Sequence, residues 1–316
     1  MNGYTASPNS PWKSLLILVG LTIGLSIAVQ MIVLVGNIFI TGDWGNIIND
    51  SNSIYADHSN LTFLYLLLAS SSIGTFLLPA IFLQKIESYA TYFPVEDINK
   101  IKNYVLAAVL LFAFAPLMQL IGEWNMRMQL PEAMGGVENW MRAQEDNMAV
   151  LTKNIVMVDS VGLLLLNIVV MAVLPAIAEE YFFRGSLQHI FQRVFKNHHV
   201  TVWVTAIIFS AIHVQFYGFF PRLILGVFFG YMFVWSRNIW IPIICHFLNN
   251  ASVTVLAYVY TKQGKTYADL QASESYPIIV YLGSLVLTAV IGWYFYKQIH
   301  QNKAIDGERL DQDQIV

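Results

Sequence analysis

The sequence predicts an all-α protein, a polytopic membrane bundle of about eight transmembrane helices. Hydrophobic residues make up 56% of the chain and charged residues only 12%, whereas soluble proteins carry about 25% charged residues. Mean hydropathy is +0.56, and the apolar residues form long blocks separated by short polar stretches. The net charge of −3 and the scattered lysines and arginines argue against nucleic acid as a partner. We expect membrane lipid to surround the protein.

Eight apolar blocks supply the expected spans. They lie at about 14–40, 61–83, 104–121, 161–178, 200–217, 223–235, 239–260 and 278–296. The first block is too long for the apolar region of a cleavable signal peptide, so we expect it to remain as the first span. The single cysteine, Cys245, excludes an internal disulfide.

The longest polar segment, 123–159, separates the third span from the fourth. Pro131 and the Gly135–Gly136 pair interrupt it, and residues 137–158 then place apolar side chains at helical spacing. We expect an amphipathic helix there, either lying at the membrane surface or packed as a small soluble helix on the loop. The chain divides into the first three spans with this loop (1–160), four central spans (161–260), and a last span with a polar tail (261–316).

The lysines and arginines predict the orientation of the bundle. With the N-terminus in the cytoplasm, the first outside loop has no basic residue, and both termini lie inside. The inside loops then hold Lys85, Lys100, Lys102, Arg193, Lys196, Arg237, Lys297, Lys303 and Arg309. The outside loops hold Arg127, Arg142, Lys153, Arg222, Lys262 and Lys265.

Two adjacent glutamates and an arginine occur at the end of the fourth apolar block, as Glu179, Glu180 and Arg184. An ionisable side chain at membrane depth costs from about 2.5 to more than 10 kcal/mol, so such residues generally have a function. The apolar pattern continues beyond Arg184 as far as Lys196, and the first break follows at Asn197. We therefore expect one extended helix over 161–196, with the glutamates near its middle.

Counting residues from the next turns estimates the depth of the polar groups. Glu179 lies eighteen positions before Asn197 and His213 sixteen positions after it, which corresponds to about 27 and 24 Å along two antiparallel helices. The two side chains should therefore lie at nearly the same level. His246 and Asn250 follow Asn238 by about 12 and 18 Å, so they are expected at a shallower level unless helix tilt absorbs the difference.

Spacing also separates the roles of these residues. Glu180 and Arg184 are four apart, as are His246 and Asn250, so each pair shares one helix face. Glu179 is about 100° from Glu180 around the helix and is free to face His213. A carboxylate near a histidine can activate water, and a histidine with an amide can stabilise an oxyanion.

A metal site is the alternative for the same donors. Glu179, His213 and His246 could hold a zinc ion with an open fourth position. The sequence has no His-Glu-x-x-His motif, so such a site would have to be assembled from separate helices.

Three short motifs in this order resemble the pattern of the CPBP family. They are Glu179-Glu180-x-x-x-Arg184, Phe209-x-x-x-His213 and His246-x-x-x-Asn250. This family comprises CAAX-processing and bacteriocin-processing (ABI-like) intramembrane proteases, including the type 2 CAAX prenyl endopeptidase. The first three spans and the long loop carry no motif that matches.

The resemblance implies an intramembrane endopeptidase acting on membrane-associated or lipid-modified polypeptides, with 161–260 as its catalytic core. It implies Glu179 as general base with His213, and His246 with Asn250 as oxyanion stabilisers. Glu180, Arg184 and Phe209 then support the site. The family is usually labelled metalloprotease, although a metal-free glutamate mechanism is also argued for it. A bacterial inner membrane is the expected location.

A second class of function stays open. Glu179 and His213 would also serve a proton-coupled transporter as a relay, and an immunity or scaffold protein could retain the same buried cluster. The absence of an internal repeat disfavours a transporter built from inverted halves. Each polar residue could instead be structural, as a compensated charge cluster, a core histidine, or a hydrogen bond between helices.

Overall fold

The computed structural model describes residues 9–42, 61–88, 90–96, 100–272 and 275–313. Helices account for nearly all of these residues, and their only β-type pairing is an isolated bridge between Val95 and Asn238. The predicted all-α fold is therefore confirmed.

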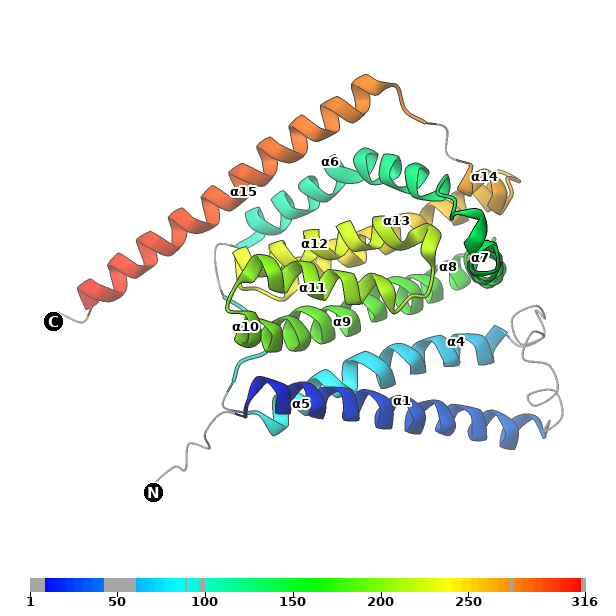
Figure 1. Ribbon diagram of the computed structural model, residues 1–316, viewed down its shortest axis with the longest axis horizontal. Helices are drawn as coiled ribbons and strands as arrows, with labels where there is room; N and C mark the ends of the chain where they lie inside the picture. Colours follow the sequence, from blue (N-terminus) through cyan, green and yellow to red (C-terminus); the bar gives the residue numbers. More distant parts are fainter. Residues whose placement is uncertain (1–8, 43–60, 89, 97–99, 273–274, 314–316) are drawn as a thin grey trace.

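The long apolar helices form a layered bundle (Figure 1). In the first part of the chain they are α1 (Pro11–Thr41), α4 (Leu61–Ser71) with its continuations η2 (Ser72–Leu77) and α5 (Leu78–Ile86), and α6 (Lys100–Met126). The fourth apolar block forms α8 (Val161–Asn167), η4 (Ile168–Val173), α9 (Leu174–Glu180), η5 (Tyr181–Gln188) and α10 (His189–Phe195). The remaining apolar helices are α11 (His198–Ala211), α12 (Phe219–Ser236), α13 (Trp240–Lys262) and α15 (Ile278–Asp313), which continues into the polar tail.

Among the described residues, seven helices are long and apolar enough to cross a membrane. The remaining expected span, 200–217, corresponds to α11, an apolar helix of 14 residues. Such a helix is about 21 Å long, shorter than the hydrocarbon core of about 30 Å. Eight complete crossings therefore stay a prediction.

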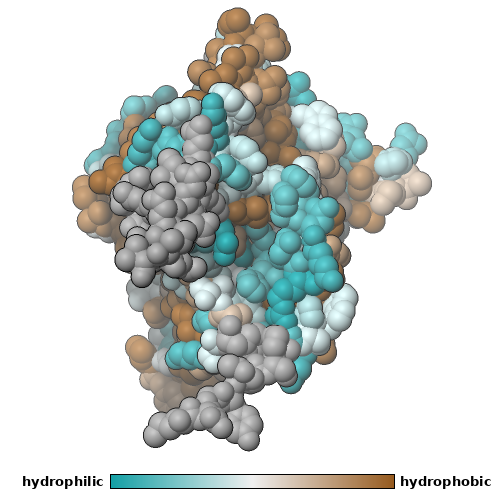
Figure 2. Space-filling model, turned by 90° about the vertical axis from the view of Figure 1, so that its left-hand side faces the viewer, coloured by the Kyte–Doolittle hydropathy of each residue, from teal (hydrophilic) through white to brown (hydrophobic). Residues whose placement is uncertain are grey.

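Successive helices run back and forth between the two ends of the bundle (Figure 1). α1 begins and α15 finishes at the same end, which agrees with termini on one side of a membrane. Polar residues gather on that end, while apolar residues cover much of the flanks (Figure 2). Which end faces the cytoplasm stays a prediction.

The expected extended fourth helix is confirmed. It runs without a break over Val161–Phe195, 35 residues, or roughly 50 Å. Lys196 ends it in the left-handed conformation with φ 52°, and the Asn197 side chain caps the start of α11 by accepting from two backbone N–H groups. Glu179 therefore lies near the middle of a helix longer than the membrane core is thick.

Two prolines coincide with π-helical turns. Pro175 follows η4 and Pro79 follows η2. Proline has no N–H and its ring collides with the carbonyl four residues earlier, which for Pro175 is that of Met171. The helix adapts by widening one turn, so residues on either side change their angular relation.

The predicted amphipathic helix is α7 (Gly135–Val156), preceded by the short turn η3 (Glu132–Met134). Leu151, Ile155 and Val156 are buried against α4 and α13, whereas Trp140 is 52% exposed. Figure 1 shows α7 end-on, so it crosses the ends of the spans nearly at right angles to them. It therefore packs on one end of the bundle, parallel to the plane of a membrane that the spans would cross.

A buried carboxylate fastens α1 to the rest of the bundle. Glu87, at the end of α5, accepts from Ser14 Oγ at 2.6 Å and Asn9 Nδ2 at 2.8 Å. It also accepts from the Tyr92 hydroxyl and lies 3.7 Å from Arg193 of α10. Most of α1 is exposed on its flank. The Glu87 cluster therefore holds the first turns of α1 against the bundle.

Close packing of α11 on α12 predicts a stability difference between two glycines. A Cβ on Gly226 would lie 3.1 Å from Ala206 Cβ and 3.2 Å from Phe209 Cδ1. We expect Gly226→Ala to lower the free energy of unfolding in detergent by about 1–3 kcal/mol.

Gly283→Ala is the matched control, because nothing lies within 4 Å of its Cβ position in α15. It should stabilise the protein by about 0.5–1 kcal/mol through helix propensity. Equal effects of the two substitutions would show that the α11–α12 contact is not tight.

Candidate active site

A buried ion pair forms the centre of the polar cluster. Arg184 Nη1 donates to Glu180 Oε1 at 2.8 Å, and the two side chains are 1% and 0% exposed. The predicted pairing of these residues along their helix is thus confirmed. Each charge is acceptable at this depth because the other compensates it.

Aromatic rings and a backbone carbonyl complete the surroundings of Arg184. Its Nη2 donates to Gly226 O at 3.0 Å. Its guanidinium lies 4.8 Å from the Phe209 ring centre and 5.4 Å from that of Phe229, within the range of cation–π attraction. The aromatic residue of the second motif therefore contacts the arginine of the first.

His246 on α13 joins the two glutamates. Its Nδ1 lies 2.9 Å from Glu180 Oε1, and its Nε2 lies 3.9 Å from Glu179 Oε2. The ring is stacked on Phe229 at a centroid distance of 5.1 Å. The sequence predicts that His246 acts together with Asn250 and that Glu180 pairs with Arg184 alone. The structure instead shows Glu180 Oε1 shared between Arg184 and His246.

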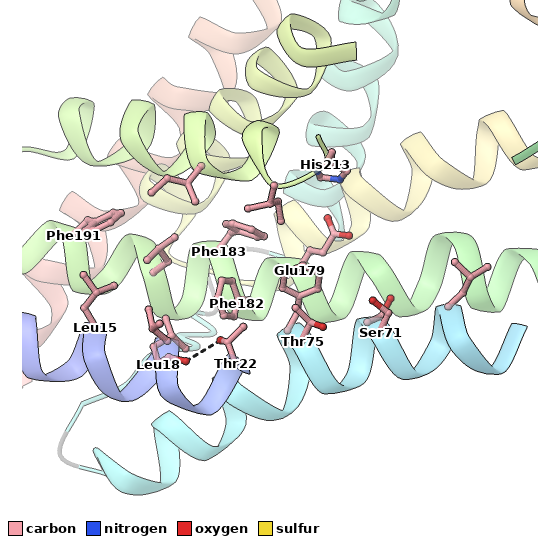
Figure 3. A pocket seen from close by; sticks show the side chains of 17 residues that line it. Leu15, Leu18, Thr22, Ser71, Thr75, Glu179, Phe182, Phe183, Phe191 and His213 are labelled. Atoms are coloured by element: carbon pink, nitrogen blue, oxygen red, sulfur yellow. Dashed lines mark hydrogen bonds between the residues drawn. The ribbon is translucent and has the colours of Figure 1, made fainter. Parts of the chain in front are cut away.

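Glu179 and His213 line the same cavity, and the Glu179 carboxylate points toward the histidine (Figure 3). This agrees with the depth estimate, which placed them at one level. His213 Nδ1 is 2.8 Å from Phe209 O. A carbonyl only accepts, so Nδ1 carries the proton, and Nε2 of the neutral ring is left with a lone pair.

The cavity has a volume of about 690 Å³ and lies between α1, α4–η2, η5–α10 and α11. Hydroxyl groups line one wall, and apolar side chains line most of the rest. From Glu179 to Phe191 it follows the long helix for twelve residues, or roughly 18 Å. The hydroxyl residues are Thr22, Ser71, Ser72 and Thr75; the large apolar residues include Leu15, Leu18, Phe76, Phe182, Phe183, Leu187, Phe191 and Ile208.

The loop that carries His213 is held in a strained conformation. Val214 has φ 52°, which is unfavourable for a β-branched residue and is found where neighbouring contacts enforce it. Asn125 of α6 supplies such contacts, because it donates to Phe216 O at 3.1 Å and accepts from Phe220 N at 3.0 Å. Neither Val214 nor Asn125 carries a signal that sequence reasoning could use.

A second polar group lies beyond His213. Gln215 donates to Glu145 Oε1 of α7 at 3.2 Å and accepts from Arg222 Nη2 of α12 at 2.6 Å. Burial raises the pKa of the Glu145 carboxyl, and the Arg222 charge partly opposes that effect. The sequence predicts Arg222 in an outside loop, but in the structure it belongs to the first turns of α12.

Asn250 contacts a carbonyl that lacks its usual α-helical donor, because the residue four positions later is Pro175. Its Nδ2 lies 3.3 Å from Met171 O, and Met171 is four residues before Pro175. The amide thus compensates the interruption in the helix that carries the glutamates. Only the second N–H of the Asn250 amide is then available to donate to an oxyanion, which is the role expected from the sequence.

The donor set does not form a metal site in this arrangement. Among the described residues no three His, Cys, Asp or Glu side chains are grouped so that they could hold a metal ion. Zinc held by Glu179, His213 and His246 therefore stays a prediction. Cys245, next to His246, is fully buried as a free thiol.

The fold and this cluster define an integral membrane protein with charged and imidazole groups opening on an apolar cavity. Residues 161–252 match the family model "Type II CAAX prenyl endopeptidase Rce1-like". All seven motif residues lie within the matched stretch, which confirms the resemblance seen in the motifs.

A curated protein is similar to part of the same chain. The chain is 29% identical over 89 residues to YpbD, an uncharacterized protein of Bacillus subtilis (strain 168). The similarity covers 27% of this chain and 42% of the relative. No solved structure matches the chain.

The buried ion pair predicts strong coupling between two substitutions. Arg184→Met leaves the Glu180 carboxylate without its cation and should lower the free energy of unfolding by about 3–5 kcal/mol. Adding Glu180→Gln removes that isolated charge, so the double variant should be more stable than Arg184→Met alone. Unfolding in detergent micelles measures both; purely additive losses would contradict the pairing.

The contact between Asn250 and Met171 O predicts a second coupling. Asn250→Ala should cost about 1–3 kcal/mol, because it leaves a buried carbonyl unpaired. In a Pro175→Ala background the backbone N–H gained at position 175 can bond to Met171 O, so the same substitution should cost little. The same loss in both backgrounds would rule out this structural role.

Proposed function

We propose that the protein is an intramembrane endopeptidase that hydrolyses peptide bonds of membrane-associated or lipid-modified polypeptides. The observation that carries the proposal is the placement of Glu179 beside His213 in the apolar cavity. The family match over 161–252 supports a CAAX-type protease. A bacterial cell (inner) membrane is the proposed location, and the similar protein of Bacillus subtilis also comes from a bacterium.

In this proposal Glu179 takes a proton from a water molecule, assisted by the lone pair of His213 Nε2. The hydroxide adds to the carbonyl carbon of the scissile bond and gives a tetrahedral oxyanion. The C–N bond then breaks, and the proton passes to the leaving amine. Water is neither oxidised nor reduced, and the products are a carboxylate and an amine.

The remaining polar residues support this chemistry. Arg184 balances the charge of Glu180, so that Glu179 can act without a second uncompensated carboxylate beside it. His246, in its protonated form with an N–H on each ring nitrogen, and the second N–H of Asn250 are the proposed donors to the oxyanion. The proposed steps use only side chains of the protein, and a chelator experiment tests whether zinc takes part.

The cavity supports a lipid-bearing or apolar substrate. Its walls are mostly leucine, isoleucine and phenylalanine side chains, and it leads away from Glu179 and His213 along η5 and α10. An apolar group of the substrate that lies in this part of the cavity would place a neighbouring peptide bond beside Glu179 and His213. The hydroxyl groups on the α4–η2 wall can bond to peptide backbone.

The first test replaces the proposed base. A fluorescence-quenched peptide with S-farnesyl cysteine followed by three aliphatic residues is offered to the purified protein in liposomes. Glu179→Gln and His213→Ala should each lower kcat by about 10²–10⁴-fold, while a normal thermal unfolding profile shows that the fold is retained.

Glu132→Gln is the matched control, because Glu132 is exposed in η3, outside the cavity lining. It should cleave like the unaltered protein. Treatment with 1,10-phenanthroline and metal analysis of the same sample test zinc, and we expect activity to survive. Failure of the unaltered protein to cleave farnesylated or unmodified membrane-bound peptides would contradict the endopeptidase proposal and favour the relay or scaffold alternatives.

A further inference from the structure

Arg222 is a largely buried cation close to the site without a carboxylate in contact. Its Nη2 donates to Gln215, but its Nη1 is buried and has no hydrogen-bond partner among the described residues. No acidic side chain in the described part of the chain lies within 4.0 Å of its nitrogens. This differs from Arg184, whose charge is matched by Glu180 in direct contact.

The backbone is shaped to admit this guanidinium. A Cβ on Gly218 would lie 2.8 Å from Arg222 Cζ, so the group packs directly on the glycine Cα. Gly218 has φ −112°, a conformation open to any residue. The glycine is therefore needed for space rather than for its torsion angles.

Arg222 lies in the first turns of α12, outside the cavity that Glu179 and His213 line. The cavity follows α10 toward the end of the bundle where that helix finishes, whereas α12 begins at the opposite end (Figure 1). Arg222 is absent from the cavity lining, yet Gln215 links it to the loop that carries His213.

We propose that Arg222 binds a carboxylate group of the substrate, on the other side of the scissile bond from the apolar group. This rests on the proposed endopeptidase function. A guanidinium offers a planar fork of donors that suits a carboxylate, and a charge-assisted bond of this kind is about twice as strong as a neutral one. The carboxylate is either the C-terminus of the peptide or an acidic side chain close to the cleaved bond.

Such a contact makes Arg222 a specificity residue. With the apolar group in the cavity and the carboxylate at Arg222, one register of the peptide places its carbonyl beside Glu179. Glu145 is joined to the guanidinium only through Gln215, and Arg222 Nη1 keeps its donor for a substrate carboxylate. Cleavage is then directed to a bond within a few residues of a negative charge.

The test measures binding without cleavage. In the Glu179→Gln background, in nanodiscs, the farnesylated peptide is compared as free acid and as C-terminal amide by fluorescence polarisation. We expect the acid to bind about tenfold more tightly, the lower range for a charged hydrogen bond. A third peptide, an amide with glutamate next to the last residue, separates a side-chain carboxylate from the terminal one.

Arg222→Gln should abolish the preference for the carboxylate-bearing peptide while the amide binds as before. Gly218→Ala should weaken the preference by displacing the guanidinium, and Arg222→Lys should retain part of it. A thermal unfolding profile of each variant shows whether it is folded. If Arg222→Gln does not fold, Gly218→Ala tests the proposal in its place.

The proposal is wrong if neither carboxylate-bearing peptide binds better than the plain amide, or if Arg222→Gln leaves the preference intact. These outcomes are independent of catalysis. Loss of cleavage on Glu179→Gln tests the endopeptidase function alone, so a protein that binds the acid form but cleaves nothing would retain this inference and contradict the other.

Discussion

The pairing of Glu180 with Arg184 is the constraint on which the rest of the site depends. A carboxylate and a guanidinium in the middle of a long apolar helix are stable only when each neutralises the other. Gly226, Phe209, Phe229 and His246 contact the pair from three further helices, while Arg184 Nε and Glu180 Oε2 have no hydrogen-bond partner among the described residues. The ion pair therefore fixes how α11, α12 and α13 pack around α9, and Glu179 is held at the edge of that cluster, where it meets the cavity.

The same ion pair gives the two glutamates different roles. Glu180 is fully buried with its charge shared between Arg184 and His246, whereas the Glu179 side chain is 13% exposed and faces the cavity. Only a carboxylate with access to water and substrate can take up and release protons during a reaction. The proposed mechanism assigns proton transfer to Glu179 for this reason, and the alternative of a proton relay would place the same demand on it.

Much of this arrangement could be predicted from spacing. The fourth helix extends to Phe195, Glu180 pairs with Arg184, and residue counts from Asn197 bring Glu179 and His213 to the same cavity. These predictions use only the rise and rotation of one helix or of two joined by a short turn. Such geometry is fixed by backbone hydrogen bonding and does not depend on the remainder of the fold.

Contacts between helices that are distant in sequence could not be predicted in the same way. His246 reaches Glu180 because α13 is placed by its packing, which a count from Asn238 does not include. Asn250 meets Met171 because Pro175 opens a π-helical turn, and that turn alters the angular relation of residues before and after it. The group of Glu145, Gln215 and Arg222 joins an amphipathic helix, a loop and a span, and no periodic pattern connects those.

The short length of α11 bears on how water reaches a reaction inside a membrane. A helix of about 21 Å is shorter than a hydrocarbon layer of about 30 Å, so we expect the loop from Ile212 to Gln215 to lie below the level of the surrounding lipid headgroups. Irregular backbone at such depth is tolerated only where protein buries it or water wets it, and Val214 in this loop is 56% exposed. We expect the bilayer to be thinned and hydrated at this place. His213 would then stand at the bottom of a solvent-filled depression, and the water consumed by hydrolysis would enter from one face of the membrane without crossing lipid.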